Sequence, residues 1–321
     1  MTVNIVPLEE RHLPDALALA RESFLREQMH VPSLPIESAD DALRDAVANT
    51  VRNGIGVAAE ESGRLQGFMA FYGPIDNLFG DAKGAISPIH AHAVTGERRD
   101  RLYSWLFQHV ADAVVGQGMT SLAISTFAHD RDVARALSFN GFGIRNADGI
   151  RDLQAPIDTS PVSGYTFAAL PPEDVLEIHP LENGLVQHLR SSPTFLALDD
   201  ITEEAFIERS RDARFFVART GSGIVGYIKI TQTGENLLTT VPWMLNITGA
   251  YLLPEHRGRG VYRGLAAYAA ATLRDKGVRL LGVDFETMNP AAFHFWSKYF
   301  DIYTHSYARR IDEGVLDRTP S

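Results

Sequence analysis

The sequence predicts an α/β protein of two tandem domains, each a mixed sheet flanked by helices, and three observations carry this prediction. The chain has 321 residues, and at roughly 150 residues per domain this length gives two domains. Apolar runs of strand period alternate with runs of helical period, as they do in α/β domains. The order of these runs in the first half returns in the second half, which indicates a duplicated domain.

Both halves follow the same order of elements. A strand and helices come first, then a hairpin, a strand, a basic turn, a helix, a strand, a helix and a final strand. The hairpins are predicted from two apolar runs around a glycine-containing turn. Helical periodicity follows in residues 102–115 and 261–273, and strand patterns follow in residues 119–126 and 279–287.

Three pairs of landmarks give the period of the repeat. Gly67 and Gly226 in the hairpins lie 159 residues apart, Arg99 and Arg257 in the basic turns lie 158 apart, and Asp130 and Asn289 before the last helices lie 159 apart. A period of domain size indicates duplication and not a solenoid. The joint is placed at residues 155–164, which are rich in Pro, Ser and Gly, so we expect domains at residues 1–155 and 165–321.

Composition excludes several function classes. The absence of cysteine excludes disulfides, Cys-ligated zinc, iron–sulfur clusters and thiol nucleophiles. The net charge of −10 argues against a nucleic-acid partner and favours cationic partners. The start of the chain lacks a signal-peptide pattern, and no apolar stretch approaches the roughly 18–20 residues that cross a bilayer. We therefore expect a soluble cytoplasmic protein without a membrane partner, as a monomer or a homodimer.

One pair of histidines deserves a metal-site test. His90 and His92 would place two imidazoles on one face of a strand, as metal ligands do. No third ligand follows at a suggestive spacing, so we expect packing residues and no metal site.

The sharpest signal is a basic glycine turn in the second half. Residues 257–260 lie between a strand expected to end at Pro254 and a helix expected to begin near Val261. Glycines let backbone N–H groups approach a ligand closely, and the start of a helix adds free donors and a partial positive charge. Together these features predict a pyrophosphate site.

This turn resembles motif A of the GNAT superfamily of N-acetyltransferases, which reads Arg/Gln-x-x-Gly-x-Gly/Ala between a strand and a helix. Arg257 and Gly260 match the motif. Tyr262 stands where the family has a small residue, and we expect its ring to crowd the loop. The preceding Leu-Leu-Pro, which ends at Pro254, matches the apolar-x-Pro of the family.

A second resemblance lies downstream. Asn289 and Ala292 match motif B of the family, Asn-x-x-Ala-x-x-x-Tyr, in which Trp296 takes the place of the tyrosine. The resemblance covers about 110 residues from Phe215 onward. It implies two tandem GNAT-type domains, each with a mixed, mostly antiparallel sheet, in a layout similar to that of the mycothiol synthases.

The resemblance also implies acetyl-CoA as co-substrate. In the family, motif A holds the pyrophosphate of acetyl-CoA, and the splayed strand before it pairs with the pantetheine amides. The coenzyme-binding residues implied in this chain are Tyr251, Leu252, Leu253, Arg257, Gly258, Arg259, Gly260, Val261, Tyr262, Asn289, Phe293 and Trp296.

The first half contains a degenerate copy of this site. Leu102 stands at the glycine position, Asp100 adds a negative charge, and Asp130 replaces the motif B asparagine. A side chain and a like charge both disfavour anion binding. We expect the first domain to keep the fold with weak or no coenzyme binding, and to act structurally or as one wall of the substrate pocket.

The implied reaction is direct acetyl transfer to an amine, without a covalent enzyme intermediate. Presenting a neutral primary amine at pH 7 costs about 4.6 kcal/mol, from a pKa near 10.4. Asp284 and Glu286 alternate on one strand and are candidate bases, with Glu286 preferred and a salt bridge or solvated face as the alternative. Tyr299 and Tyr303 are candidate acids, although a tyrosine in such a stretch is more often core.

The sequence therefore predicts an acetyl-CoA-dependent N-acetyltransferase that acts on a small-molecule amine, with the active site in the C-terminal domain. The acidic balance favours a cationic amine. A non-catalytic acyl-CoA sensor or scaffold is an alternative, which the off-pattern Tyr262 and Trp296 favour. A protein or peptide N-acetyltransferase is a further alternative.

Overall fold

The structure is a computed structural model that describes residues 3–157 and 160–317. It divides into two compact units. Among the described residues, the first comprises 3–147, 236–238 and 302–317, and the second comprises 148–157, 160–235 and 239–301. The expected joint at residues 155–164 includes residues 158–159, which lie outside the described residues. Unlike the two expected ranges, the first unit includes the last strand of the chain.

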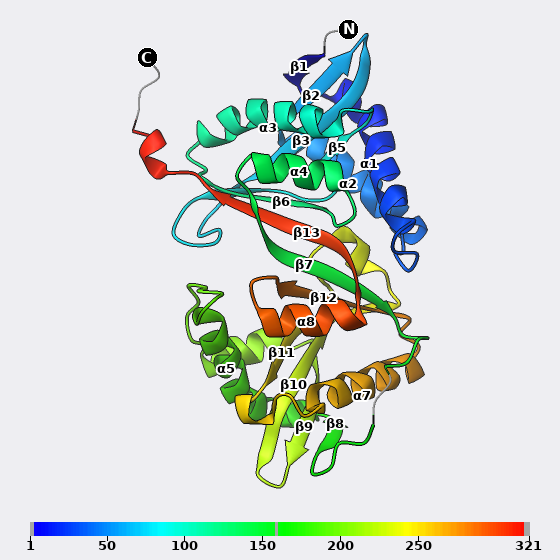
Figure 1. Cartoon of the computed structure of the whole chain (residues 1–321), viewed down its shortest axis with the longest axis vertical. Coiled ribbons are helices and arrows are strands. Elements are labelled where there is room, and N and C mark those ends of the chain that lie inside the picture. Colours follow the sequence, from blue (N-terminus) through cyan, green and yellow to red (C-terminus); the bar gives the residue numbers. More distant parts are fainter. Residues whose placement is uncertain (1–2, 158–159, 318–321) are drawn as a thin grey trace. The chain divides into compact units, whose positions relative to one another are not determined.

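In its described residues, the first unit has a path of six paired strands, a short extra strand and four α-helices (Figure 1). The strand order is β1-β2-β3-β4-β6-β13, and β5 pairs with β3. Its strands are β1 (Asn4–Pro7), β2 (Ile55–Glu61), β3 (Arg64–Ile75), β4 (Gly84–Ser87), β5 (His92–Val94), β6 (Ser121–Phe127) and β13 (Asp301–Arg310). Its helices are α1 (Leu13–Gln28), α2 (Asp40–Asn53), α3 (Arg99–Val115) and α4 (Arg131–Phe139).

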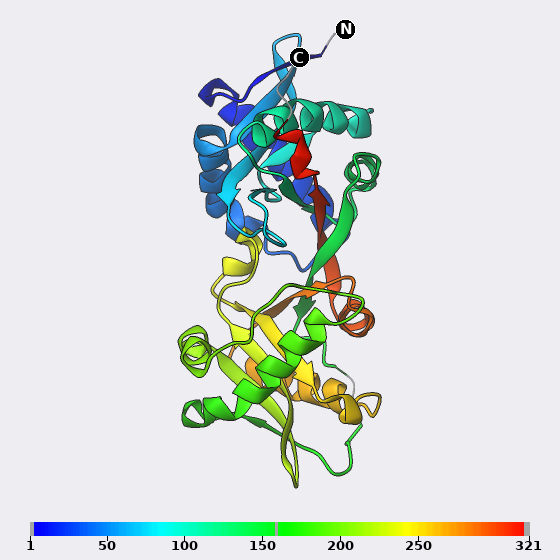
Figure 2. The ribbon, with the colours of Figure 1, turned by 90° about the vertical axis from the view of Figure 1, so that its left-hand side faces the viewer.

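The core of the first unit lies between its sheet and α3. Met69 and Phe71 of β3 pack with Leu106 and Val110 of α3, and all four are buried. Ala70, between them in sequence, points to the opposite face, toward the end of α2. Figure 2 shows α2 and α3 on opposite sides of this sheet.

The second unit repeats this plan. Its strands run in the order β12-β11-β10-β9-β8, and β7 lies beside β12. The strands are β7 (Gly143–Asp152), β8 (Thr166–Ala169), β9 (Arg214–Thr220), β10 (Gly223–Thr231), β11 (Met244–Leu252) and β12 (Leu280–Glu286). The helices are α5 (His179–Arg190), α6 (Glu203–Ser210), α7 (Val261–Asp275) and α8 (Pro290–Tyr299).

The predicted mixed, mostly antiparallel α/β fold is confirmed. Parallel pairing occurs between β4 and β6 and between β11 and β12, and the other pairs with a described register are antiparallel. The duplication is visible in the element starts: β2 and β9, β3 and β10, β6 and β12, and α4 and α8 each begin 159 residues apart. Within the described residues, no helix is long and apolar enough to cross a membrane.

Opposite faces of the second sheet carry different helices. Tyr227 of β10 donates a hydrogen bond of 2.8 Å to the Glu182 carboxylate on α5. Phe216 of β9 packs against Tyr268 of α7, with ring centroids 6.2 Å apart. Since Phe216 lies on β9 between Phe215 and Val217, which share the core of Tyr227, α5 and α7 cover opposite faces.

Candidate active site

The glycine turn forms an open loop before α7. β11 ends at Leu252, a short 3-10 turn covers Pro254–His256, and α7 begins at Val261. Gly258 and Gly260 have φ values of +73° and +78°, in the left-handed region that favours glycine. A Cβ on Gly258 would meet no described atom within 4 Å, so the backbone of the loop is accessible to a ligand.

Tyr262 does not crowd this loop, contrary to expectation. Its ring packs against α8, with centroids 4.9 Å from Phe295 and 5.7 Å from Trp296. The described atom near a Cβ on Gly260 would instead be Nη2 of Arg263, at 3.6 Å. The reason is that the second position of α7 directs its side chain toward α8 and away from the loop.

Arg257 ties the loop to the end of β11. Its Nε donates a hydrogen bond of 2.9 Å to the Leu252 carbonyl, and its guanidinium lies over the Tyr251 ring at 5.4 Å from the centroid. The first unit repeats this contact, because Nε of Arg99 donates to the Val94 carbonyl at 3.2 Å. In both copies the motif arginine is therefore tied to the end of the preceding strand.

β11 and β12 separate beside the loop. Their pairing covers Met244–Ile247 with Leu280–Val283, whereas both strands continue further. Leu253 N–H donates to the Val225 carbonyl, toward β10, so by strand alternation the N–H of Leu252 faces the open side. An unpaired backbone donor at this place can bind a carbonyl or an oxyanion.

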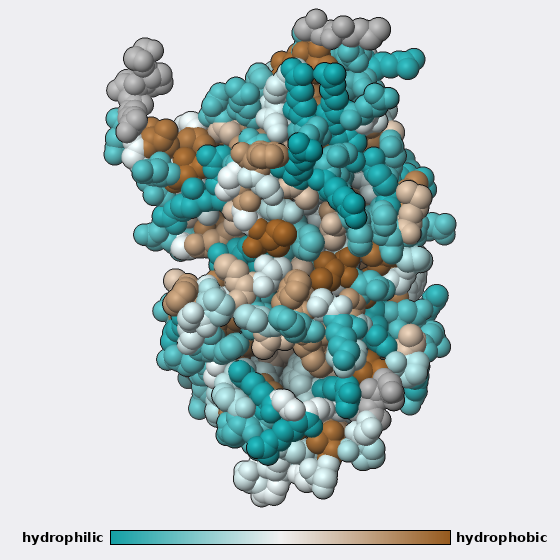
Figure 3. All heavy atoms as spheres, viewed as in Figure 1, coloured by the Kyte–Doolittle hydropathy of each residue, from teal (hydrophilic) through white to brown (hydrophobic). Residues whose placement is uncertain are grey.

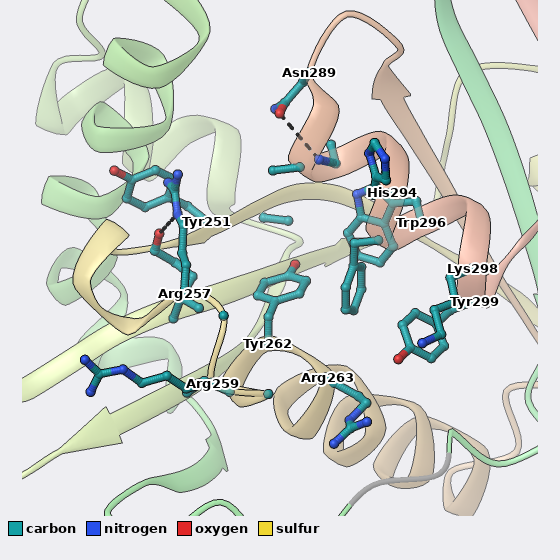
Figure 4. Close-up of a pocket in the computed structure, with 18 of the residues that line it drawn as sticks. Tyr251, Arg257, Arg259, Tyr262, Arg263, Asn289, His294, Trp296, Lys298 and Tyr299 are labelled. Atoms are coloured by element: carbon teal, nitrogen blue, oxygen red, sulfur yellow. Dashed lines mark hydrogen bonds between the residues drawn. The ribbon is translucent and has the colours of Figure 1, made fainter.

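A cavity of about 800 Å³ joins these parts (Figure 4). It is lined by most of the predicted coenzyme residues and one candidate acid: Tyr251, Leu252, Arg257, Gly258, Arg259, Gly260, Val261, Tyr262, Asn289, Trp296 and Tyr299. Leu253, Phe293, Asp284 and Glu286 are not part of this lining. Leu253 packs in the core on the α5 side, and Phe293 packs against Phe285 with centroids 6.3 Å apart.

Several lining residues were not predicted. Leu185 and His188 come from α5, one helical turn apart, and Arg263, His294, Phe295 and Lys298 come from α7 and α8. The sequence could have shown that Leu185 and His188 share one face of a helix, from their spacing. It could not have shown that this face borders the cavity, because that depends on tertiary packing. Figure 3 shows the surface hollowed in the second unit, with hydrophilic side chains bordering the hollow.

Two buried donors at the start of α7 have no partner. The Tyr262 hydroxyl oxygen and Nε of Arg263 are buried and make no hydrogen bond among the described residues. Buried polar groups are almost always paired in folded proteins. Two unpaired donors beside one cavity therefore fit a ligand that carries acceptors, as phosphates and amides do.

Asn289 begins the second helix of the site. Its side chain accepts a hydrogen bond of 3.4 Å from the Ala292 backbone N–H and so caps α8. Trp296 lies further along this helix. It is buried and forms one wall of the cavity.

The two candidate bases lie on the face of β12 opposite α8. Phe285, which packs toward α8, separates Asp284 from Glu286, so both carboxylates point the other way. Burial, and then the nearby carboxylates of Glu235, Asp148 and Glu286, raise the pKa of Asp284 well above its usual value. A carboxylate with a raised pKa is a stronger base.

The two candidate acids are placed differently. Tyr299 lines the cavity, and its ring lies 4.9 Å from that of Phe295. Tyr303 belongs to the first unit, where it is buried and its hydroxyl accepts a hydrogen bond of 2.8 Å from Asn236. Tyr303 is therefore not part of the cavity.

The equivalent place in the first unit is built differently. α3 already begins at Arg99, so the residues that match the glycine loop are helical, and Leu102 is buried in the core. The guanidinium of Arg99 pairs with the carboxylate of Asp130, the motif B position, and both side chains are only 11% exposed. Asp130, which replaces the motif B asparagine, therefore forms an ion pair with Arg99, the arginine at the motif A position.

His90 and His92 of the first unit are both withdrawn from water. His92 is buried, its Nε2 lies 2.8 Å from the Ser125 carbonyl, and its Nδ1 lies 3.3 Å from the Tyr103 hydroxyl. Burial lowers the pKa of His90 and of His92 to about 4, so both imidazoles are neutral at pH 7. These contacts account for His92 as a packing residue.

Comparisons with known proteins agree with this geometry. Residues 183–301 match the model of the acetyltransferase (GNAT) family. A GCN5-related N-acetyltransferase from Sphaerobacter thermophilus has a similar structure, with a TM-score of 0.61 at 14% identity over 96% of this chain and 95% of that one. No curated protein matches the chain in sequence.

Two further solved structures are similar over 96% of this chain, each at 16% identity. One is the glucosamine N-acetyltransferase region of a fungal multi-domain GH3 β-N-acetylglucosaminidase, with a TM-score of 0.51 over 38% of that chain. The other is a tandem GNAT protein from the clavulanic acid biosynthesis pathway, with a TM-score of 0.48 over 98% of that chain. The match to the acetyltransferase (GNAT) family thus lies in the second unit, and the chain as a whole shares the fold of the GCN5-related N-acetyltransferase from Sphaerobacter thermophilus.

Proposed function

We propose that the chain transfers an acetyl group from acetyl-CoA directly to a primary amine of a small molecule, in the second unit. The observation that carries the proposal is the cavity of about 800 Å³ that connects the glycine loop to the unpaired end of β11. The loop and the start of α7 offer backbone donors to a pyrophosphate. The free edge of β11 offers further backbone groups to the pantetheine amides.

The proposed reaction needs a base for the amine, a donor for the oxyanion and a proton for the leaving thiolate. The amine nitrogen attacks the thioester carbonyl carbon, and its proton goes to the carboxylate of Asp284 or Glu286, directly or through water. The Leu252 N–H is positioned to stabilise the oxyanion. The carbon–sulfur bond then breaks, and the thiolate leaves with the proton that Tyr299 or water supplies. Neighbouring carboxylates at Asp284 favour a cationic amine.

The first unit has a structural role in this proposal. Its helical start at Arg99 leaves no glycine loop, and Asp130 already neutralises the motif arginine. An anionic ligand there would have to displace an ion pair that is mostly buried. One acetyl-CoA per chain is therefore the expected stoichiometry.

Calorimetry with acetyl-CoA tests the proposal. Gly260→Asp places a side chain and a negative charge in the loop, at a φ of +78°. Gly277→Asp is the matched control, because Gly277 has a φ of +87° at the other end of α7 and lies outside the cavity lining. We expect micromolar binding of one acetyl-CoA by wild type and Gly277→Asp, and none by Gly260→Asp.

Turnover is then measured by thiol release across polyamines, aminoglycosides and amino sugars. The chain has no cysteine, so every thiol detected comes from the coenzyme. Binding without release on any amine would favour the sensor or scaffold function. No binding to wild type would contradict the proposed enzyme.

A further inference from the structure

The first turn of α7 carries a hydroxyl that the fold itself does not use. Tyr262 belongs to the cavity lining, and its hydroxyl oxygen is buried and makes no hydrogen bond among the described residues. A buried O–H without an acceptor is unfavourable, because it loses its hydrogen bonds to water on folding. Such a group is accounted for when a bound molecule supplies the acceptor.

The ring of Tyr262 is held in one orientation. Phe295 and Trp296 contact it edge to face, with interplanar angles of 79° and 82°. Figure 4 shows the side chain extending from α7 into the space between β11 and α8. Burial raises the pKa of the Tyr262 phenol well above its usual value, so the hydroxyl stays protonated and acts as a donor.

The position of Tyr262 in α7 indicates which part of the coenzyme would lie beside its hydroxyl. It lies two residues beyond Gly260, about 3 Å along the helix, and so close to the expected pyrophosphate. In an acyl-CoA the chain that leaves the pyrophosphate is the pantetheine arm, whose amide carbonyls are acceptors. The cavity continues from Tyr262 along the unpaired end of β11, at Ala250 and Leu252.

We propose that the Tyr262 hydroxyl donates a hydrogen bond to an amide carbonyl of the pantetheine arm, an inference that rests on the proposed coenzyme site. Tyr262 is then a residue that binds the coenzyme through its side chain. Trp296, which replaces the motif tyrosine, provides the ring surface that orients it.

Two ligands and two variants of the full chain test this assignment by calorimetry. The ligands are CoA and adenosine 3′-phosphate 5′-diphosphate, which keeps the phosphates and lacks the pantetheine arm. Tyr262→Phe removes only the hydroxyl. Tyr268→Phe is the matched control, since Tyr268 lies on the same helix, packs against Phe216 and is outside the cavity lining.

We expect Tyr262→Phe to weaken CoA binding five- to tenfold and to leave nucleotide binding unchanged, while Tyr268→Phe changes neither. The ligand-free Tyr262→Phe protein should melt at or above the wild-type temperature, because it loses an unpaired buried hydroxyl. Equal weakening of both ligands, unchanged CoA binding, or a lower melting temperature would overturn the assignment. If wild type binds neither ligand, the proposed coenzyme site itself fails.

Discussion

Asp284 combines two properties that follow from one cause. Its burial disfavours the ionised form, and Glu235, Asp148 and Glu286 disfavour it further, so the pKa of Asp284 is raised. A raised carboxyl pKa suits a general base that works near neutral pH. The raised pKa also makes the free energy of unfolding depend on pH. The stabilising contribution of Asp284 is fully present below the pKa of this carboxyl in the unfolded chain, and it is lost as the pH rises through its pKa in the folded protein.

Asp284→Asn should therefore separate activity from stability. We expect turnover to fall by about 10²- to 10⁴-fold, the usual loss for a general base. The melting temperature should be less dependent on pH than that of wild type, and higher above the folded pKa, because no buried charge forms. Asp275→Asn, on an exposed residue at the end of α7, is the control. Thermal melts from pH 5 to 9 check this, and lower stability of Asp284→Asn at high pH would contradict it.

Arg263 is a cation beside the glycine loop for which the described residues supply no ion pair. Its Nε is buried without a partner, and its Nη2 lies near Gly260. We expect Arg263→Gln to weaken acetyl-CoA binding by about tenfold or more, since a hydrogen bond to a charged group contributes about 1.5–3 kcal/mol. The loss should shrink at high salt. Arg274→Gln, on the same helix and outside the cavity lining, should bind as wild type does.

These residues also show what the sequence could and could not predict. Arg257 and Gly260 were predictable because their spacing before a helix is local. The orientation of Tyr262 toward α8 was not, since it depends on Phe295 and Trp296, which arrive from a distant segment. That Arg263 lacks a partner is likewise a property of the folded neighbourhood alone.

Among the elements, α3 and α7 show how one position changes a helix start. Gly260 takes a left-handed conformation and ends the loop, whereas Leu102, at the matching place, continues the helix and packs in the core. The sequence predicts this difference between the two helix starts, because a leucine is disfavoured at positive φ. It does not predict the end of β11–β12 pairing at Ile247, because this end results from no single residue type.

The ion pair at the start of α3 gives an element-scale prediction. Arg99→Gln leaves the mostly buried carboxylate of Asp130 without its partner, which costs about 3–5 kcal/mol. We expect the first unit to unfold at lower urea and acetyl-CoA affinity to stay unchanged. Arg135→Gln removes an exposed cation from neighbouring α4 and should change neither. Weaker acetyl-CoA binding by Arg99→Gln would contradict a purely structural role.

At the scale of the whole molecule, the last strand of the chain belongs to the unit that is built mainly from the first half of the sequence. Each half was predicted to end in a strand, and both strands exist as β7 and β13. β13 pairs antiparallel with β6, from Thr304 with Phe127 to Arg310 with Ser121. Local patterns identify a strand but not its partner, since pairing is decided by contacts far apart in the chain.

Tyr307 tests to which unit the end of the chain contributes stability. It lies on β13, is 4% exposed and packs in the core of the first unit with Tyr103 and Phe107. Tyr307→Ala should cost that unit about 3–5 kcal/mol, as large-to-small changes of buried aromatic residues do. If residues 165–321 formed one independent domain, the loss would instead fall on the second unit.

Fluorine NMR of 5-fluorotryptophan in urea distinguishes the two outcomes. Trp105 reports on the first unit, and Trp243 and Trp296 report on the second. In Tyr307→Ala the Trp105 signal should reach its unfolded position at lower urea, with the other two signals unmoved and acetyl-CoA still bound. Phe285→Ala, in buried β12, should do the reverse. The two variants remove comparable rings from different units. Opposite shifts would therefore assign β13 to the first unit, and a Tyr307→Ala shift confined to Trp243 and Trp296 would assign it to the second.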